Sequence, residues 1–359
     1  MSWNSPLAHL PPLSEHPSVS PSLSPAISDG SLAILGASVR LDQFEERSYS
    51  ASRVIRAFLD HLEDDGKRML VADIAICDDD DALVKLANHL IDAILKPFKL
   101  AGGQAPTPLS LPQTPGAEHA IDVAMATIET STRQEQQHLR DDCLHRDGYR
   151  CVYSGNLDMN SCEKGDVVVP PGAQTTITQC AHIIPFALGS FDDTDAVQTR
   201  NKAIIWFAIH RYFPAIRDKI DTRSIKQRDN AIILDIYVHG LFGGYNIGFL
   251  PQGLNLYRIT KFFTYAMSVN SKSGSPLVEF TSHDHTVPMP DADFLMTHYI
   301  ISQILQVSGI GRQLDKAVEM ALVDLDCHAL HLSGSTDVGN MISRRLLMTV
   351  RTGFGDSKD

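Results

Sequence analysis

Two histidines and one asparagine in the middle of the sequence have types and a spacing that could support chemistry. His182 stands in the apolar segment CAHIIPFALG, and Asn230 precedes His239 by nine residues. Histidine titrates near neutral pH, so an oriented imidazole can take a proton from water or bind a metal ion. Taken alone, His182 is more often a buried histidine that donates to a backbone carbonyl. The chemistry therefore depends on whether the three residues converge.

One carboxylate lies close to this set in the sequence. Asp235 precedes His239 by four residues, so both side chains can share one face of a short helix. Asp235 is thus a candidate metal ligand, although an aspartate at this place is more often a helix N-cap. Asn230 also has a second interpretation, as a turn residue that caps its own backbone. Four other histidines have no spacing that suggests a site: His210, His283, His285 and His298.

The apolar pattern predicts the elements that must position these residues. Residues 149–158 and 175–185 are β-prone, and a turn is expected between them at Ser154 and Gly155. A second apolar run leads to Asp235, and a short helix is expected to carry His239 until the next glycines stop it. A helix precedes these segments, and another, ending at Pro214, lies between them.

Three segments together resemble the fungal branch of the HNH endonucleases. RDGYRCVYSG, CAHIIPF and NAIILDIYVHGLF follow that branch's motifs R-D-x-x-R-C-x-x-T-G, A-H-I-x-P and N-x(8)-H-x-L-F in order. The resemblance covers residues 139–250. It implies an α+β fold in which a ββα-metal core lies between mainly helical N-terminal and C-terminal regions.

Four regions are expected on this basis. Residues 1–30 are rich in proline and serine and are expected to be a disordered tail. Residues 31–115 are expected to hold a short strand at 31–41, two amphipathic helices within 51–65 and 78–98, and a proline-rich linker. Residues 116–255 would form the HNH-like domain with its preceding helix. Residues 256–359 are expected to form a helical C-terminal region.

The resemblance also implies roles for the candidate residues. His182 would be the base, Asn230 would fix the loop and helix, and His239 would bind a divalent metal ion, with Asp235 as a candidate second ligand. Hydrolysis of a phosphodiester bond requires a water nucleophile, a base for its proton and a cation for the phosphate charge. The implied activity is therefore metal-dependent cleavage of DNA or other nucleic acid, with Mg²⁺, Mn²⁺ or Zn²⁺ as the ion.

Two positions depart from the family's pattern. Ala181 stands where many HNH enzymes carry an acidic metal ligand, although the fungal branch also tends to carry alanine there. Gly243 stands where the family usually has an aspartate. Both changes remove carboxylates, which a hard cation such as Mg²⁺ prefers as ligands.

Charge leaves a second function open. The net charge is -12, whereas nucleic-acid binders usually present a basic surface. The basic residues between Arg217 and Arg228 are either a local basic rim beside the site or a solvated face. The aromatic and aliphatic stretches IIWFAIHRYF and FFTYAM could instead line an apolar pocket. The alternative is an HNH-like scaffold that serves as a small-molecule enzyme of fungal secondary metabolism or as a non-catalytic interaction protein.

Cysteines and apolar runs indicate the compartment. The six cysteines form no C-x-x-C pair, which favours free thiols over a zinc knuckle or a disulfide framework. Cys151 and Cys180 are expected to pack against each other or against nearby core. No apolar run reaches the roughly 18 residues of a membrane-spanning helix, and no signal segment is recognised. An intracellular protein, cytoplasmic or nuclear and without a membrane partner, is therefore expected.

Overall fold

The chain folds into two compact units whose parts alternate along the sequence. The computed structural model describes residues 28–100, 109, 114–125, 136–189, 191, 194–264, 267 and 269–326. Unit 1 consists of Met1–Thr130, Phe191–Asp221 and Ile304–Asp359, and unit 2 consists of Ser131–Ser190 and Thr222–Gln303. The expected tail lies outside the described residues except for its last three, and so does most of the proline-rich linker.

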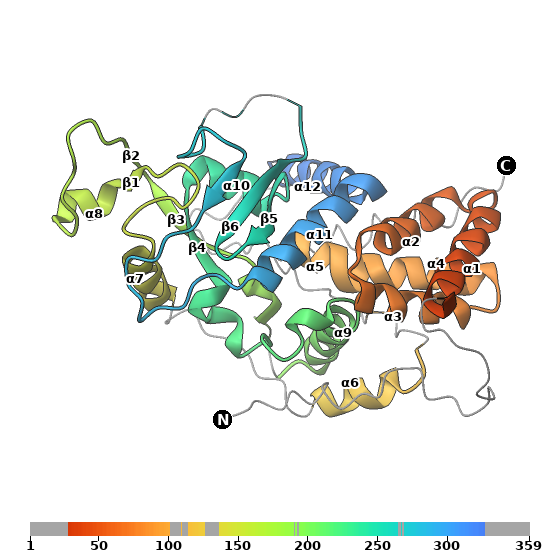
Figure 1. Cartoon of the computed structure of the whole chain (residues 1–359). Coiled ribbons are helices and arrows are strands. Elements are labelled where there is room, and N and C mark those ends of the chain that lie inside the picture. Colours follow the sequence, from red (N-terminus) through yellow and green to blue (C-terminus); the bar gives the residue numbers. More distant parts are fainter. Residues whose placement is uncertain are drawn as a thin grey trace. The chain divides into compact units, whose positions relative to one another are not determined.

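Unit 1 is helical throughout its described part (Figure 1). Its helices bury large apolar side chains, among them Phe44, Phe58 and Phe98. The elements of this unit are α1 (Ser28–Glu45), α2 (Tyr49–His61), α3 (Asp64–Ala75), α4 (Asp80–Leu90), the π-helical turn η1 (Ile91–Leu95), α5 (Lys96–Lys99), α6 (Ala117–Met125), α9 (Ala196–Tyr212), the short 3-10 helix η4 (Pro214–Ile216) and α12 (Ile310–Asp326).

The strand expected over residues 31–41 is wrong, because these residues lie within α1. Ala37, Leu41 and Phe44 are the buried apolar residues of this helix, and α1 packs against α2. Their spacing of four and three residues is that of one helix face. A run of apolar residues is compatible with a strand over a short window. The residues that are actually buried, however, follow the period of a helix. The helices expected within 51–65 and 78–98 are confirmed.

Helix α9 contains the aromatic stretch that the sequence offered as a pocket lining. The Asp195 side chain caps the helix by accepting from the backbone N–H of Val197 at 2.8 Å, and the helix ends at Tyr212, before Pro214, as expected. Trp206 and Phe207 are buried with the other apolar residues of the stretch from Ala203 to Phe213. The composition of this stretch is therefore explained by the core of unit 1.

Unit 2 holds the strands of the described part of the chain and all four candidate residues. Its first half comprises α7 (Gln136–Arg146), β1 (Leu157–Asp158), α8 (Met159–Lys164), β2 (Thr175–Thr176), β3 (Thr178–His182) and the 3-10 helix η3 (Phe186–Gly189). Its second half comprises η5 (Ser224–Lys226), η6 (Arg228–Asn230), β4 (Ala231–Asp235), α10 (Ile236–Gly243), β5 (Ile247–Gly253), β6 (Leu256–Lys261), β7 (Leu277–Glu279) and most of α11 (Ala292–Ser308).

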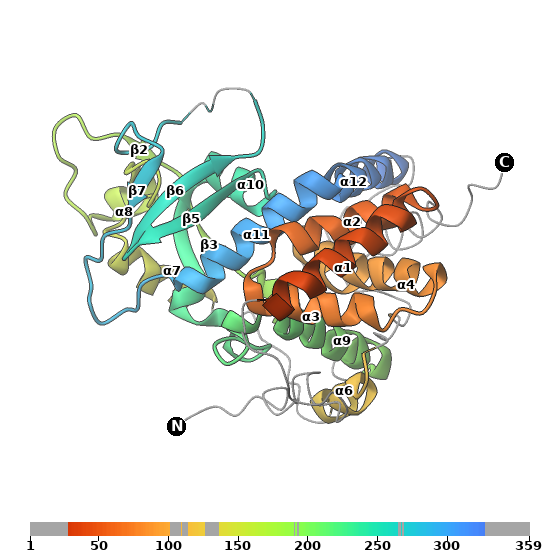
Figure 2. The same cartoon turned by 45° about the vertical axis from the view of Figure 1, so that its right-hand side comes forward.

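The strands of unit 2 form three small sheets (Figure 2). β1 pairs in parallel with β2, β3 pairs antiparallel with β4, and β5, β6 and β7 form an antiparallel sheet in that order. Every residue of β4 is buried, and α10 follows β4 directly and packs against both β3 and β4. This mixture of helices with small sheets is consistent with the expected α+β class.

Residues 256–359 are not helical throughout, since β6 and β7 lie at their start. The side chains of β6 alternate, with Tyr257 and Ile259 buried and Arg258 exposed between them. This alternation with a period of two residues is typical of a strand. The expectation of a helical region considered only the overall apolar content and not this alternation. Further along, the helical expectation for this region is confirmed by α11 and α12.

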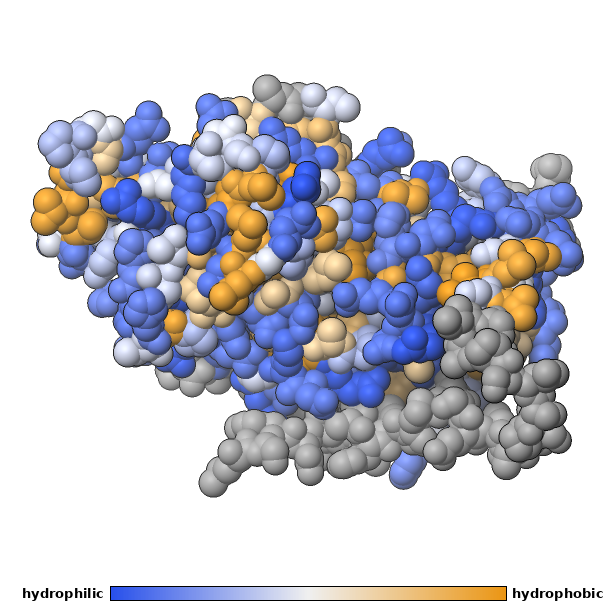
Figure 3. Space-filling view, in the orientation of Figure 1, coloured by the Kyte–Doolittle hydropathy of each residue, from blue (hydrophilic) through white to orange (hydrophobic). Residues whose placement is uncertain are grey.

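Exposed apolar residues occur in both units, and three of them, Leu32, Leu35 and Val39, lie along one face of α1. Val168 is 87% exposed and Leu254 is 92% exposed, each on a loop of unit 2. Figure 3 shows hydrophobic residues of the visible face in separate patches between hydrophilic ones, which is ordinary for a folded chain in water. Among the described residues, no helix has the length and apolar content to cross a membrane.

Candidate functional site

The pairing of β3 with β4 brings His182 beside Asn230. His182 is the last residue of β3, and its partner in the register is Ala231, which directly follows Asn230. Two residues separated by 48 positions along the chain are therefore neighbours at one end of a two-stranded ladder.

Asn230 is fully buried and uses its whole carboxamide. Its Oδ1 accepts from the backbone N–H of Ile184 at 2.8 Å, and its Nδ2 donates to the carbonyls of Ile184 at 3.0 Å and Ile225 at 2.8 Å. Its own backbone carbonyl accepts from the N–H of Ile183 at 2.9 Å. The two residues after His182 are thus fixed by Asn230, as an orienting residue requires.

His182 has a buried ring nitrogen. Its Nε2 makes no hydrogen bond to any residue that the structure describes, and its ring lies 5.4 Å from that of Phe186. Desolvation, helped by the charge of His239, lowers the pKa of His182 to about 4. The imidazole is therefore neutral at pH 7, and a neutral imidazole has one ring nitrogen whose unshared electron pair can accept a proton from water.

Helix α10 carries the other two candidates. Asp235 is its N-cap, with Oδ1 accepting from the N–H of Tyr237 at 2.9 Å and Oδ2 accepting from the Thr176 hydroxyl at 2.5 Å. This confirms the N-cap interpretation of Asp235. His239 lies one turn further along and is half-buried, and desolvation lowers its pKa. Its charge acts on His182, so the two imidazoles belong to one locality.

The residues near His182 do not make a complete site for a hard divalent ion. Over the described part of the chain, no three His, Cys, Asp or Glu side chains converge to hold a metal ion. Both oxygens of Asp235 already accept hydrogen bonds, and positions 181 and 243 supply no carboxylate. His182 and His239 themselves offer imidazole nitrogen, whereas Mg²⁺ prefers oxygen ligands.

A buried ion pair that the sequence did not single out lies at the end of α7. Arg146 is fully buried, and its guanidinium donates to both carboxylate oxygens of Asp147, at 2.7 Å and 3.0 Å. Asp147 Oδ2 also accepts from the N–H of Ile233 in β4. The signal is present in the R-D pair of the first motif, which contributes to the resemblance but has no role assigned from the sequence.

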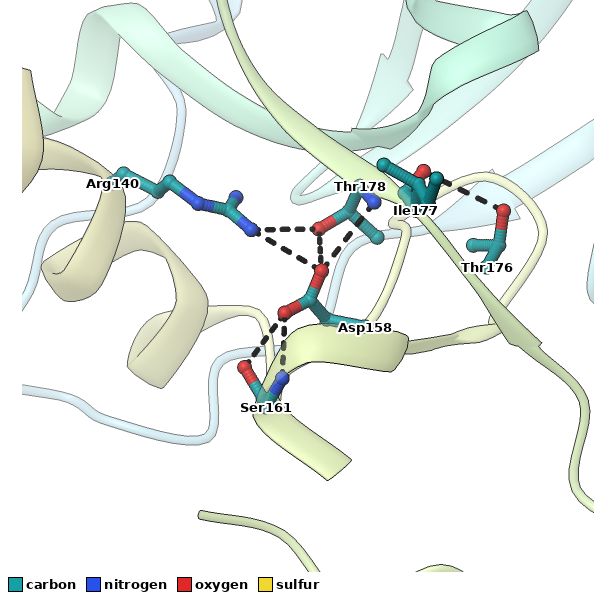
Figure 4. A network of polar contacts seen from close by, with 6 residues as sticks. All are labelled: Arg140, Asp158, Ser161, Thr176, Ile177 and Thr178. Carbon is teal, nitrogen blue, oxygen red and sulfur yellow. Dashed lines mark hydrogen bonds and ion pairs between the residues drawn. The ribbon is translucent and has the colours of Figure 1, made fainter. Parts of the chain in front are cut away.

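A second polar network, around Asp158, was also missed (Figure 4). Asp158 is fully buried and accepts from the Thr178 hydroxyl at 2.6 Å, from the Ser161 hydroxyl at 2.8 Å and from Arg140 at 3.2 Å. Burial raises the pKa of Asp158, but these hydrogen bonds outweigh burial and hold the pKa below its ordinary value. The network joins α7, β1 and α8 to the first residue of β3.

Replacing Asp158 with alanine is expected to lower the free energy of unfolding by about 3 kcal/mol, because buried donors lose a charged acceptor. The exposed Asp166→Ala variant is the control and should change it by less than about 0.5 kcal/mol. The pKa of Asp158 is depressed in the folded state, so its contribution is present above the ordinary carboxyl pKa and is lost as pH falls through the folded value. Urea unfolding at pH 7 and pH 3 measures both effects. Equal losses in the two variants at pH 7 would refute this role.

The structure shows where the cysteines of unit 2 pack and how one residue of the basic segment is paired. Cys180 lies beside Cys143, and both pack with the core cluster that includes Ile233 of β4, while Cys151 is buried, so packing against nearby core, one of the two arrangements expected, is confirmed. The hydrogen bond with Cys143 and burial raise the pKa of the Cys180 thiol. Arg228 forms an ion pair with Asp142 at 2.7 Å, so its charge is already balanced within unit 2.

Comparisons with known proteins bear on this region alone. Neither the curated proteins nor the solved structures gave a match to the chain. The site residues described above lie within or directly beside one segment that does match a family. Residues 151–250, which include His182, Asn230, Asp235 and His239, match the family model described as HNH endonuclease.

Proposed function

We propose that unit 2 hydrolyses phosphodiester bonds of nucleic acid, with His182 as the general base. The observation that supports this most is the state of His182, a neutral imidazole whose Nε2 has no described partner and whose following residues are held by Asn230. It stands in a segment that matches the HNH endonuclease family. The buried histidines His210 and His298 each pair their Nε2 with a backbone carbonyl, whereas the Nε2 of His182 has no such partner among the described residues.

The proposed chemistry assigns one task to each residue. His182 Nε2 accepts a proton from a water molecule as the water oxygen attacks phosphorus and the bond to the leaving oxygen breaks. Asn230 keeps the backbone after His182 in place, so the ring direction is set before the substrate binds. His239 remains the proposed ligand of a divalent ion, while Asp235 is assigned to capping the helix that carries it.

A cleavage assay tests this function. Supercoiled plasmid and a single-stranded RNA would be incubated with the native chain in Mg²⁺, Mn²⁺ or Zn²⁺, and with a chelator. The expected result is nicked plasmid in at least one metal and none with the chelator. The His210→Gln variant is the control for substitutions of His182 and should cleave like the native chain. His210 is also a buried histidine with a pKa of about 4, but it belongs to unit 1. Intact plasmid and intact RNA under every condition would overturn the proposal.

The small-molecule alternative has less support in the structure. The expected apolar pocket drew on two stretches. Residues 204–213 are buried in the core of unit 1, whereas in the second stretch Phe262 and Phe263 are half-buried and Met267 is buried. The candidate histidines lie in unit 2. Phosphodiester hydrolysis is therefore the function that these residues support best.

The pH dependence of cleavage follows from the pKa of His182. A base must be neutral, and the pKa of about 4 keeps His182 neutral at every pH above roughly 5. We therefore expect kcat/KM to stay level from pH 8 to pH 5 and to fall only as pH approaches 4. Initial rates of nicking measure this acid limb of the pH profile. Circular dichroism at each pH confirms that the protein stays folded. An acid limb near 6.5, the ordinary histidine pKa, would show that His182 is not held in the desolvated state described here.

A further inference from the structure

Arg146 contacts the backbone on either side of Asn230, the residue that in turn holds the segment after His182. Its guanidinium has five N–H donors, and the structure gives each terminal nitrogen a carbonyl partner besides Asp147. Nη1 donates to the carbonyl of Arg228 at 2.7 Å and to that of Pro288 at 3.1 Å, and Nη2 donates to the carbonyl of Ala231 at 2.7 Å.

Two of these carbonyls bracket Asn230. Arg228 begins the 3-10 turn that ends with Asn230, and Ala231 begins β4 immediately after it. One rigid, planar group thus holds the backbone on both sides of a single residue. A lysine could not reproduce this, because its ammonium is a point donor without the fixed fork of a guanidinium.

The contacts continue without a gap to the candidate base. Arg146 holds the Arg228 and Ala231 carbonyls, and Asn230 between them holds the backbone of Ile183 and Ile184 through its own carbonyl and side chain. Ile183 directly follows His182 in the chain. A displacement of the 228–231 turn therefore shifts the segment whose position sets the direction of the His182 ring.

Stability alone does not account for this arrangement. A buried ion pair costs desolvation, and well-packed apolar residues of similar volume are often as stable. The guanidinium instead provides directional contacts to three carbonyls that lie 82 to 142 positions away in sequence. Directional contact to one turn is what a positioning residue supplies.

We infer that Arg146 is a positioning residue for the hydrolytic site, acting on His182 through the 228–231 turn and Asn230. This inference rests on the proposed function for its consequence in catalysis. The structural part of the inference depends only on the contacts of Arg146. The positioning role and the proposed function can therefore fail separately.

Amide hydrogen exchange in Arg146→Lys tests the structural part. The N–H groups of Ile183 and Ile184 report directly on Asn230, since each donates to it. Their exchange should accelerate by about tenfold more than that of the β5 and β6 ladder in the same unit. Arg211→Lys is the matched control, because Arg211 makes an equally short two-point pair with Asp73 in unit 1. It should leave Ile183 and Ile184 unchanged.

Kinetics tests the catalytic part. Arg146→Lys should lower kcat by about tenfold with little change in KM, because a misplaced base slows chemistry more than binding. Equal acceleration of exchange at Ile184 and in the β5 and β6 ladder would show a merely structural role and overturn the inference. If the native chain cleaves nothing, the proposed function fails while the exchange result still decides the positioning role.

A milder variant covers the case in which Arg146→Lys does not fold. Asp147→Asn keeps an acceptor for the N–H of Ile233 and the carbonyl partners of Arg146, but it removes the charge that orients the guanidinium. The same selective acceleration at Ile183 and Ile184 is expected, with a smaller size. Unchanged exchange at both amides in this variant would likewise overturn the inference.

Discussion

Replacing His182 with alanine is expected to lower the rate of phosphodiester cleavage by about a thousandfold, the usual contribution of a positioned general base. The loss should appear in kcat with little change in KM, because the ring acts on the attacking water rather than on the substrate. His182 lies at the end of β3 and is not among the fully buried residues, so the variant should fold. Single-turnover nicking of plasmid, with protein in excess, measures the chemical step.

His182→Gln refines this expectation. Glutamine keeps a polar side chain of similar length but has no nitrogen that can take a proton near neutral pH, so its rate should match that of the alanine variant. His210→Gln should retain the native rate. Cleavage within threefold of native in His182→Ala would mean that another group accepts the proton, and the assignment of the base would be wrong.

Replacing Asn230 with alanine is expected to produce the largest loss of stability of any variant proposed for unit 2. The change removes three buried hydrogen bonds and leaves the N–H of Ile184 and the carbonyl of Ile225 without their partner. Each unpaired buried group costs on the order of 1 to 3 kcal/mol, so a total of about 4 kcal/mol is expected. The midpoint of urea unfolding followed by circular dichroism measures it.

The Asn230→Asp variant tests the two hydrogen bonds that Asn230 donates separately from the one that it accepts. An aspartate can still accept from the N–H of Ile184, but at neutral pH its second oxygen would face two carbonyls. Burial beside carbonyls raises a carboxyl pKa, so stability should fall as pH rises through the ordinary value and recover in acid. Asn160→Ala, on the exposed side of α8, is the control and should change stability by less than about 0.5 kcal/mol. A loss of that size in Asn230→Ala would show that the carboxamide does not hold the site.

The local elements of the site could be predicted from the sequence because local signals specify them. The apolar run before Asp235 predicts β4, and an aspartate followed by seven residues and a glycine pair predicts α10 with its N-cap. His182 at the end of an extended segment is likewise local information. These elements are the ones on which the resemblance depends.

Other parts of the fold were missed because tertiary contacts decide them. The apolar residues of α1 fit a strand over a short window, and packing against α2 selects the helix. The partners of Arg146 are distant in sequence, so no spacing rule finds them. A buried arginine beside an aspartate is a visible signal, but only the fold shows which carbonyls it contacts.

Asp235 shows how one residue can satisfy two patterns. Its spacing to His239 suited a shared metal ion, and its place before a helix suited a cap. The structure gives its oxygens to the N–H of Tyr237 and the hydroxyl of Thr176, which is the geometry of the cap. Only three-dimensional contacts separate the two interpretations, since both predict the same residue at the same position.

The central claim is that burial next to His239 keeps His182 as a neutral base at physiological pH. Titration of the His182 ring by NMR, in the native chain and in His239→Gln, tests this claim most directly. The ring should stay neutral until pH falls to about 4, and its midpoint should rise in His239→Gln because a neighbouring positive charge is removed. A midpoint near 6.5 in the native chain, unaltered by the His239 substitution, would contradict the claim.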